Sequence, residues 1–240
     1  MNKIPAIIGL GKTGISLAKH LSKFNNTLFI FESSPNSKSL KELKDIDIDF
    51  VLNPELSDNI FNSISVIYPS PGISKDHEIF KYAKDFNIPV QTDMDIYLNS
   101  SSSFKILITG TNGKTTTACM LEHLLKEHLK DMSVEVMGNI GKPVLDFLDK
   151  KIDVAIIEIS SFQIESCSKL YSDIGILLNI EEDHMEEPST EHKIEILKGV
   201  IEKQEVRIKK IELKLLSLRI VVWGGVALFV FAPYLKRVFG

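Results

Sequence analysis

Cysteine is scarce in this sequence: the 240 residues contain only two, Cys119 and Cys167. Neither belongs to a Cys-x-x-Cys pair, which argues against a zinc knuckle or a disulfide framework as the basis of the fold. We therefore interpret both cysteines as reduced thiols of a cytosolic protein.

A strong charge excess is also absent, because the formal net charge is -4. The large positive excess typical of nucleic-acid-binding proteins is not found. The N-terminal stretch lacks the pattern of a signal peptide, since its apolar run is short and interrupted by glycine. Charged residues at 25% and hydrophobic residues at 44% are ordinary values for a globular protein.

Short apolar runs alternate with polar helical stretches up to about Glu186. This alternation indicates parallel sheets covered by helices, and it restarts after the polar run at residues 99–103. We therefore predict an α/β protein in two units. A Rossmann-like domain is expected at residues 1–98, and a partial P-loop-type parallel-sheet domain at residues 104–186.

A different kind of sequence follows residue 186. Apolar residues recur there with heptad spacing, which predicts a long helix over residues 187–214. Residues 215–235 form an apolar run whose one charge is Arg219, and the run is long enough for a transmembrane helix. The alternative is a helix buried inside a soluble protein. More basic residues precede the run than follow it, which predicts a cytoplasmic N-terminal side.

The stretch GLGKTG follows a strand-like run and precedes a helix-like one. Its glycines Gly9, Gly11 and Gly14 fit the pattern G-x-G-x-x-G, and Glu32 ends the next predicted strand. Such a turn lets a phosphate approach the backbone at a helix start, so a nucleotide-type ligand is favoured. Taken alone, the motif is typical of dinucleotide sites. A tight turn without a ligand is the other interpretation.

The stretch GTNGKTTT lies between another apolar strand and a helix. Backbone N–H groups of such a loop hold phosphates, Lys114 would neutralise the β- and γ-phosphates, and the Thr115 hydroxyl would bind Mg²⁺. The standard loop begins with a glycine where this chain has Ile108, so the loop is a variant. A chance glycine turn is the alternative.

Polar side chains follow two further apolar strands. Glu158 ends the first of them, and His184 follows the second, next to Asp183. Parallel strands bring their carboxyl ends to one edge of the sheet, so Lys114, Glu158 and His184 are expected to converge there. A carboxylate at this edge suits Mg²⁺. An exposed acid at a strand end and a structural histidine are the alternatives.

Taken together, these motifs resemble the Mur ligase family over about residues 1–186. GLGKTG, SPGI, TGTNGKTTT, GNIGKP, EISSFQIE and LNIEEDHM stand in the family's order and separation. The stretch GTNGKT alone would indicate the wider group that includes folylpolyglutamate synthetases. SSFQ after the strand-end Glu158, together with the N-terminal GLGKTG, resembles the members that add D-glutamate.

The resemblance implies an ATP- and Mg²⁺-dependent ligase of peptidoglycan precursor synthesis. Its partners would be UDP-N-acetylmuramoyl-L-alanine and D-glutamate, joined through an acyl phosphate. It also changes the expected ligand of the GLGKTG turn from a nicotinamide dinucleotide to UDP, which the glycine pattern could not decide.

The resemblance also implies roles for individual residues. Those at the ATP loop are Gly110, Thr111, Asn112, Gly113, Lys114, Thr115 and Thr116. Those with a catalytic or metal-binding role are Lys114, Thr115, Glu158 and His184. Those that would contact the UDP-linked substrate are Gly11, Lys12, Thr13, Glu32, Ser33, Ser70, Pro71, Gly72 and Asn139.

The chain departs from the family after residue 186. Lys198 lies at about the distance of the family's carbamylated lysine, but its surroundings do not resemble that region, and the role is not carried over. We therefore expect a truncated chain that binds UDP-linked substrate and ATP without turnover. It would be cytoplasmic, or held at the inner face of the plasma membrane by residues 215–235. The alternative is a membrane-anchored coiled-coil protein, a homo-oligomer through its heptads, with a nucleotide-binding or inert N-terminal module.

Overall fold

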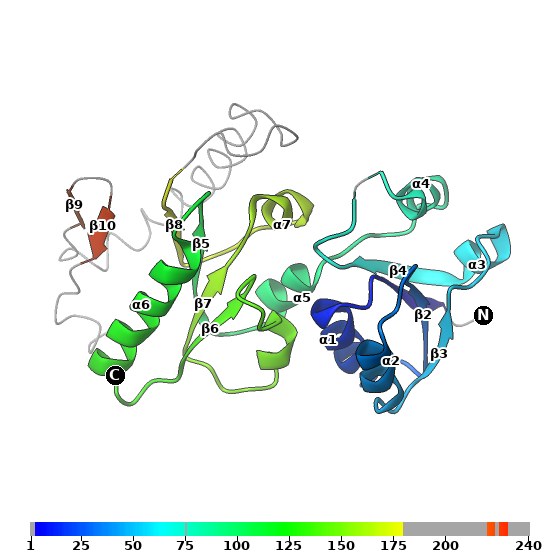
Figure 1. Cartoon of the computed structure of the whole chain (residues 1–240), viewed down its shortest axis with the longest axis horizontal. Helices are drawn as coiled ribbons and strands as arrows, with labels where there is room; N and C mark the ends of the chain where they lie inside the picture. The colour runs from blue at the N-terminus through cyan, green and yellow to red at the C-terminus, as the bar shows by residue number, and fades with distance from the viewer. Residues whose placement is uncertain (1–2, 75, 180–219, 224–225, 230–240) are drawn as a thin grey trace.

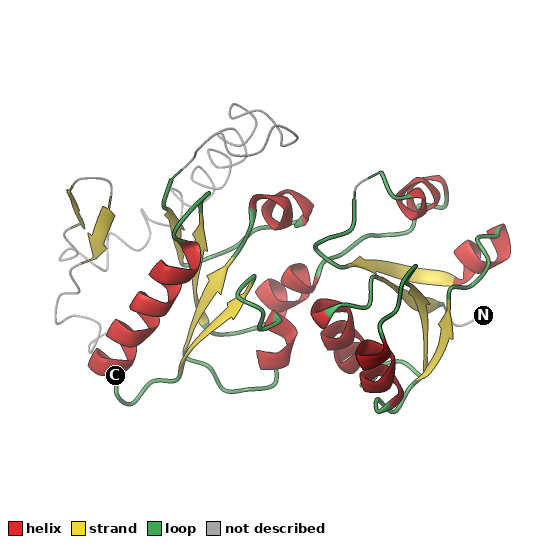
Figure 2. Cartoon of the chain, viewed as in Figure 1, coloured by secondary structure: helices red, strands yellow, loops and turns green. Residues whose placement is uncertain are grey.

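The computed structural model describes residues 3–74, 76–179, 220–223 and 226–229. Two four-stranded parallel sheets form its framework (Figure 1, Figure 2). This confirms the predicted α/β class, with two parallel-sheet units in series.

The first sheet has the strand order β3-β2-β1-β4. Helices α1 and α2 pack on one face of it, and α3 and α4 on the other. Because the order reverses between β1 and β4, the loops after these two strands flank the point where parallel sheets usually bind ligands. The elements are β1 (Ile4–Ile8), α1 (Lys12–Leu21), β2 (Thr27–Phe31), α2 (Ser37–Lys44), β3 (Asp49–Leu52), α3 (Asp58–Ser63), β4 (Ile64–Pro69) and α4 (Glu78–Asp85).

The second sheet has the strand order β6-β7-β5-β8. Its central strands β5 and β7 are the predicted apolar runs, which parallel sheets bury on both faces. Helix α6 covers one face through Ala118, Leu121 and Leu125. The elements are β5 (Phe104–Thr109), α6 (Lys114–His128), β6 (Val134–Gly138), η1 (Val144–Phe147), β7 (Val154–Glu158), α7 (Ser161–Ser166) and β8 (Ile174–Leu177).

Helix α5 (Asp93–Ser100) and the short 3-10 helix η1 join the two sheets (Figure 1). Their apolar side chains pack with those of α1 in one continuous core, which also takes in side chains from both sheets. Tyr97 on α5 and Val144 on η1 are fully buried in this core. Each such burial stabilises the fold by about 1.5–3 kcal/mol. The two domains therefore share a hydrophobic core.

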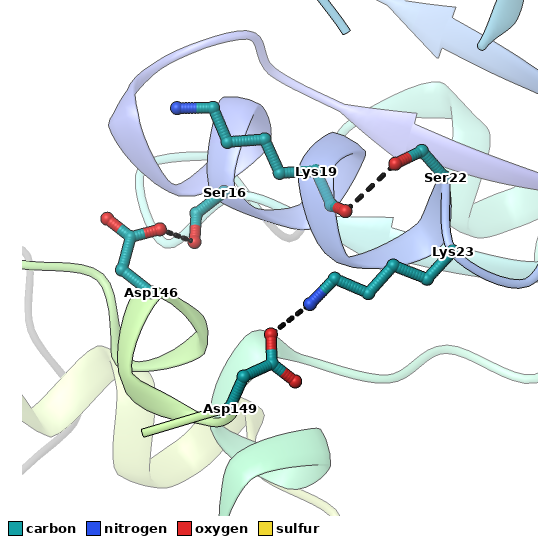
Figure 3. Close-up of polar contacts among 6 residues, drawn as sticks. All are labelled: Ser16, Lys19, Ser22, Lys23, Asp146 and Asp149. Carbon is teal, nitrogen blue, oxygen red and sulfur yellow. Dashed lines mark hydrogen bonds and ion pairs between the residues drawn. The ribbon is translucent and has the colours of Figure 1, made fainter. Parts of the chain in front are cut away.

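Polar contacts supplement this core at its surface. Ser16 on α1 donates a hydrogen bond of 2.5 Å from Oγ to Oδ1 of Asp146 on η1. Lys23, just beyond α1, pairs with Asp149, just beyond η1, as Figure 3 shows. The hydrogen bond from Lys23 holds the pKa of Asp149 below its ordinary value. Because both side chains of this pair are exposed, it stabilises the domain contact much less than the core does.

Helix α5 begins with a buried acid, Asp93, which is 4% exposed. Burial is the main cause that raises the pKa of its carboxyl to about 6. Backbone N–H groups oppose this rise, and the negative charge of Asp95 adds to it. The protein therefore carries a carboxyl group at the domain junction whose ionisation lowers the stability of the folded state.

The turn between β1 and α1 depends on a close approach of two glycines. A Cβ added to Gly14 would lie 2.1 Å from the carbonyl oxygen of Gly9. The Oγ of Ser70, after β4, donates a hydrogen bond of 3.0 Å to that same carbonyl. The start of α1 can therefore lie against the turn only because Gly14 has no side chain.

The C-terminal part differs from the expected transmembrane helix at residues 215–235. The described residues of this range form two antiparallel strands, β9 (Ile220–Trp223) and β10 (Val226–Phe229). Among the helices that the structure describes, none is long and apolar enough to cross a membrane. The run contains four valines and four aromatic residues and is interrupted by Gly224 and Gly225, a composition that favours a hairpin over a helix. The predicted heptad helix at residues 187–214 lies outside the described residues.

The substitution Gly14→Ala is expected to destabilise the protein by about 1–3 kcal/mol, because the turn must shift to admit the methyl group. Gly72→Ala is the matched control, since a Cβ there meets nothing within 4 Å. The control should change the stability by less than about 0.5 kcal/mol. Urea unfolding measures both free energies, and equal losses in the two variants would contradict this account.

The substitution Asp93→Asn is expected to stabilise the protein at about pH 8 but hardly at about pH 4. The folded chain has the higher pKa, so raising the pH through the window from about 4 to about 6 favours unfolding. Above that window the folded chain bears the whole cost of the buried charge, on the order of 1–3 kcal/mol, which the neutral amide avoids. Urea unfolding across this pH range measures the difference, with the exposed first-turn acid variant Asp58→Asn as control. A gain in stability that is independent of pH would count against the assignment.

Candidate functional site

The turn after β1 presents open backbone at the start of α1. Gly11 is the N-cap of this helix and provides no side-chain cap. Uncapped N–H groups and the positive end of the helix dipole attract phosphate. Gly11, Lys12 and Thr13, which the resemblance assigns to the UDP diphosphate, therefore lie where a phosphate can approach the backbone.

Glu32 braces this turn through its carboxylate. One oxygen accepts the N–H of Leu10 at 2.7 Å, and the other accepts the N–H of Ser34 at 2.9 Å. Asn53 in turn holds the backbone of Glu32, donating to its carbonyl at 2.8 Å and accepting its N–H at 2.7 Å. Glu32 thus shapes the turn from the end of β2, beside the exposed Ser33. Contacts of Glu32 and Ser33 with a uridine remain a prediction.

The turn after β4 lies against the same loop. Ser70 donates its N–H to the carbonyl of Ile8 at 2.8 Å, in addition to its hydroxyl bond to Gly9. Pro71 and Gly72 follow and are exposed. The structure therefore brings together the two N-terminal segments that the resemblance assigns to the UDP-linked substrate.

In the second domain, the side chain of Lys114 binds back to the backbone of the loop after β5. Gly113 is the N-cap of α6 with a φ of 81°, a conformation that favours glycine. The ammonium of Lys114 donates to the carbonyl oxygens of Gly110 at 2.6 Å and Thr111 at 2.8 Å. Its positive charge is therefore held over the loop at the start of α6, where Thr116 is exposed in the first turn.

Asn179, just beyond β8, holds the outer side of this loop. Its backbone oxygen accepts the N–H of Thr111 at 3.1 Å, and its Oδ1 accepts the N–H of Asn112 at 2.8 Å. Its Nδ2 donates to the carbonyl of Asn112 at 3.2 Å. The sequence pattern assigned no role to Asn179, although a polar residue soon after an apolar strand was a usable signal.

Glu158 ends β7 as a carboxylate that is 3% exposed. The Oγ1 of Thr115 donates to its Oε2 at 2.7 Å, and the Nδ2 of Asn139 lies 3.3 Å from its Oε1. The N–H of Asn139 also donates to the backbone oxygen of Glu158 at 2.9 Å. The edge of the second sheet therefore gathers Thr115, Asn139 and Glu158, with Lys114 next to Thr115 in the chain. The predicted convergence of Lys114, Glu158 and His184 cannot be followed to His184, which lies outside the described residues.

The oxygen atoms of Thr115 and Glu158 fit a magnesium ion. They lie 2.7 Å apart, close to the spacing of about 2.9 Å between neighbouring ligands in a magnesium octahedron. Within the described part of the chain there is no cluster of three or more His, Cys, Asp or Glu side chains that could hold a metal. Mg²⁺ commonly takes one or two protein oxygens and completes its shell with water and phosphate. The third predicted ligand, His184, lies outside the described residues, as does Lys198.

Residues of the two domains approach each other at two places. The Nζ of Lys12 lies 3.2 Å from the position that a Cβ on Gly141 would take, so this side chain reaches the loop after β6. A cavity of about 160 Å³ also lies between the domains. Ser70 and Pro71 line it from the first domain, and Gln163 on α7 lines it from the second. A ligand bound here could therefore contact both domains at once.

Both the N-terminal and the central part of the chain match models of known protein families. The family model described as "Mur ligase MurD-like, N-terminal domain" matches residues 3–92. The model described as "Mur ligase middle domain" matches residues 108–207, beyond the boundary at 186 that we predict from the sequence.

Proteins named UDP-N-acetylmuramoylalanine--D-glutamate ligase are similar to this chain. The protein of Rickettsia bellii (strain RML369-C) is 35% identical over 181 residues, which cover 75% of this chain and 39% of that protein. The protein of Wolbachia pipientis wMel is 33% identical over 188 residues, covering 77% of this chain and 36% of that protein. The chain thus spans less than half the length of the relatives that it matches.

A solved structure shares the fold. It is the UDP-N-acetylmuramate:L-alanyl-gamma-D-glutamyl-meso-diaminopimelate ligase from Neisseria meningitides, with a TM-score of 0.51 and 14% identity. The alignment covers 82% of this chain and 67% of that chain. The family matches and the parallel-sheet domains agree with one another, and the chain belongs to the Mur ligase family, of which it carries the MurD-like N-terminal domain and middle-domain sequence.

Proposed function

We propose that this chain carries the UDP-substrate site and the ATP site of a D-glutamate-adding Mur ligase. The substrate would be UDP-N-acetylmuramoyl-L-alanine, and the reaction would join its alanine carboxylate to the amine of D-glutamate. The names of the relatives that cover most of this chain support the substrate class. The observation that carries the proposal is the reach of Lys12 to Gly141, which joins the two halves of the site.

The UDP end of the substrate would bind the first domain. Its diphosphate would lie at the uncapped start of α1, beside Gly11, Lys12 and Thr13. The uridine would lie toward Glu32 and Ser33, and the turn at residues 70–72 would line the same site. The sugar and its alanine would then extend toward Asn139 in the second domain.

ATP would bind the loop at residues 110–116. The ammonium of Lys114 now holds two carbonyl oxygens of the loop, and a triphosphate would offer it stronger, charged acceptors. Thr115 and Glu158 would hold Mg²⁺, which neutralises charge on the phosphate oxygens when it is bound.

The reaction would proceed in two balanced steps. The alanine carboxylate attacks the γ-phosphorus of ATP, and the bond from that phosphorus to the bridging oxygen breaks. The products of this step are ADP and an acyl phosphate. The amine of D-glutamate then attacks the acyl carbon and loses a proton as phosphate departs. Lys114 would neutralise the transferred phosphoryl group, and the Asn139 side chain would orient the substrate.

We assign none of the residues described in 3–74 and 76–179 to D-glutamate. The expectation that this chain binds without turnover stays a prediction. Phosphate release on mixing the full chain with ATP, Mg²⁺, D-glutamate and the UDP-linked substrate measures turnover directly. Sustained release would contradict that expectation and would support the complete ligase activity.

The substitution Lys114→Met is expected to weaken binding of ATP with Mg²⁺ by about 10–100-fold, because it removes a charged donor from the phosphate loop. Affinity for UDP-N-acetylmuramoyl-L-alanine should stay within about twofold, since this ligand binds largely outside the loop. Lys126→Met is the matched control, because Lys126 lies on the same helix and pairs with Glu122 at the surface.

Isothermal titration calorimetry on the full chain measures each affinity. The assignment of the ATP site fails if Lys114→Met and Lys126→Met bind ATP equally well. It also fails if the unaltered chain binds no ATP in the presence of Mg²⁺.

A further inference from the structure

Asp95, on α5, is a buried acid with an unusually complete set of hydrogen bonds; it is 3% exposed. Its Oδ2 accepts the N–H and the hydroxyl of Thr92, both at 2.9 Å. Its Oδ1 accepts the N–H and the hydroxyl of Ser168, both at 2.8 Å, and the N–H of Lys169 lies 3.4 Å away. One oxygen thus caps α5, and the other binds the segment that follows α7.

These bonds attach the start of α5 to the second domain. The residues just before α5 belong instead to the first sheet, because Gln91 donates its N–H to the carbonyl of Ile67 at 3.0 Å. The N–H of Ile67 donates in turn to the carbonyl of Pro89 at 2.9 Å. The attachment of the chain therefore changes from one domain to the other between Gln91 and Thr92.

Helix α7 has a capped start, and the segment just beyond its end is attached to α5. At its start, Ser160 and Gln163 form a capping box, with the N–H of Ser160 3.0 Å from Oε1 of Gln163. Beyond its end, Ser168 is held by Asp95. Gln163 and Ser166 of α7 line the cavity between the domains, and Ser70 lines it from the first domain. Asp95 therefore holds the chain directly after this wall, next to Cys167, which also lines the cavity.

We propose that Asp95 is a positioning residue for the UDP-linked substrate: it holds α7 at the distance from the Ser70 turn that fits the substrate beyond its diphosphate. This inference rests on the proposed function. Asp95 itself is buried, does not line the cavity and would contact neither ATP nor UDP. Its effect is confined to the portion of the ligand that reaches the second domain.

The chemistry of the carboxylate explains why another side chain cannot take its place. The donors from Thr92 and from Ser168 approach the two oxygens from different segments. An amide at this position has one acceptor oxygen, and its NH₂ group would face the other pair of donors. Asp95→Asn must therefore lose either the cap of α5 or the bond to Ser168, with little change in volume.

The test compares three ligands on the full chain by isothermal titration calorimetry. UDP reports the first domain alone, ATP with Mg²⁺ reports the second, and UDP-N-acetylmuramoyl-L-alanine reports the space between them. In Asp95→Asn, affinity for the complete substrate is expected to fall by about tenfold, while the other two affinities stay within about twofold. Ser168→Ala removes one of the bonds and should give a smaller loss in the same direction. Asp58→Asn, an exposed acid at the start of α3, is the matched control.

The outcomes separate this inference from the proposed function. If the unaltered chain binds none of the three ligands, the proposed function fails and the inference falls with it. If the unaltered chain prefers the complete substrate over UDP, and Asp95→Asn keeps this preference, only the positioning role is overturned. An equal loss for all three ligands in Asp95→Asn would also overturn it, since a general loss of structure acts that way. If Asp95→Asn does not fold, the same three affinities are measured in Ser168→Ala. A loss confined to the complete substrate supports the positioning role, and no loss or an equal loss for all three ligands overturns it.

Discussion

The apolar layer between the two sheets is the constraint on which the rest of the structure depends. Side chains of α1, α5 and η1 pack there in one core with side chains of both sheets. Each fully buried aliphatic or aromatic side chain contributes about 1.5–3 kcal/mol, far more than the exposed pair of Lys23 and Asp149 can. The core therefore sets how the two domains meet, and surface charges only adjust it.

The consequence for function follows from the direction of the strands. All strands within each of the two larger sheets are parallel, so the carboxyl ends of the strands, and the loops that follow them, lie at one edge of each sheet. The shared core brings the turn after β1 and the loop after β6 within reach of one side chain, Lys12. Buried carboxylates complete the arrangement. Glu158 and Asp95 are both almost inaccessible, and both are paired with donors, which limits the cost of their burial.

Much of this arrangement could be predicted from local sequence. Apolar runs of strand length gave the two parallel sheets, and glycines before helix-like stretches gave both phosphate-type loops. The contact of Thr115 with Glu158 also follows, because Glu158 ends β7 and Thr115 begins the helix after β5, the neighbouring strand of the same sheet. These features depend on residues close together in the chain or on the general geometry of parallel sheets.

Other features could not be predicted, for identifiable physical reasons. Asp95 and Ser168 are far apart in sequence, and no periodic pattern marks a pair that meets only through packing. The bracing role of Glu32 depends on backbone N–H donors, which every residue type except proline supplies. The apolar run at residues 215–235 is consistent with a helix or with strands by hydrophobicity alone. There the valines, the aromatic residues and the two glycines were the better guide to β9 and β10.

The central claim is that one ligand spans both domains at the space between them. Hydrogen–deuterium exchange of the full chain, with and without UDP-N-acetylmuramoyl-L-alanine, tests this directly. The account predicts that the ligand slows exchange both in the first domain, at residues 9–14 and 70–73, and in the second, at residues 139–142 and 163–168. Protection confined to one domain, or no protection in either, would contradict it.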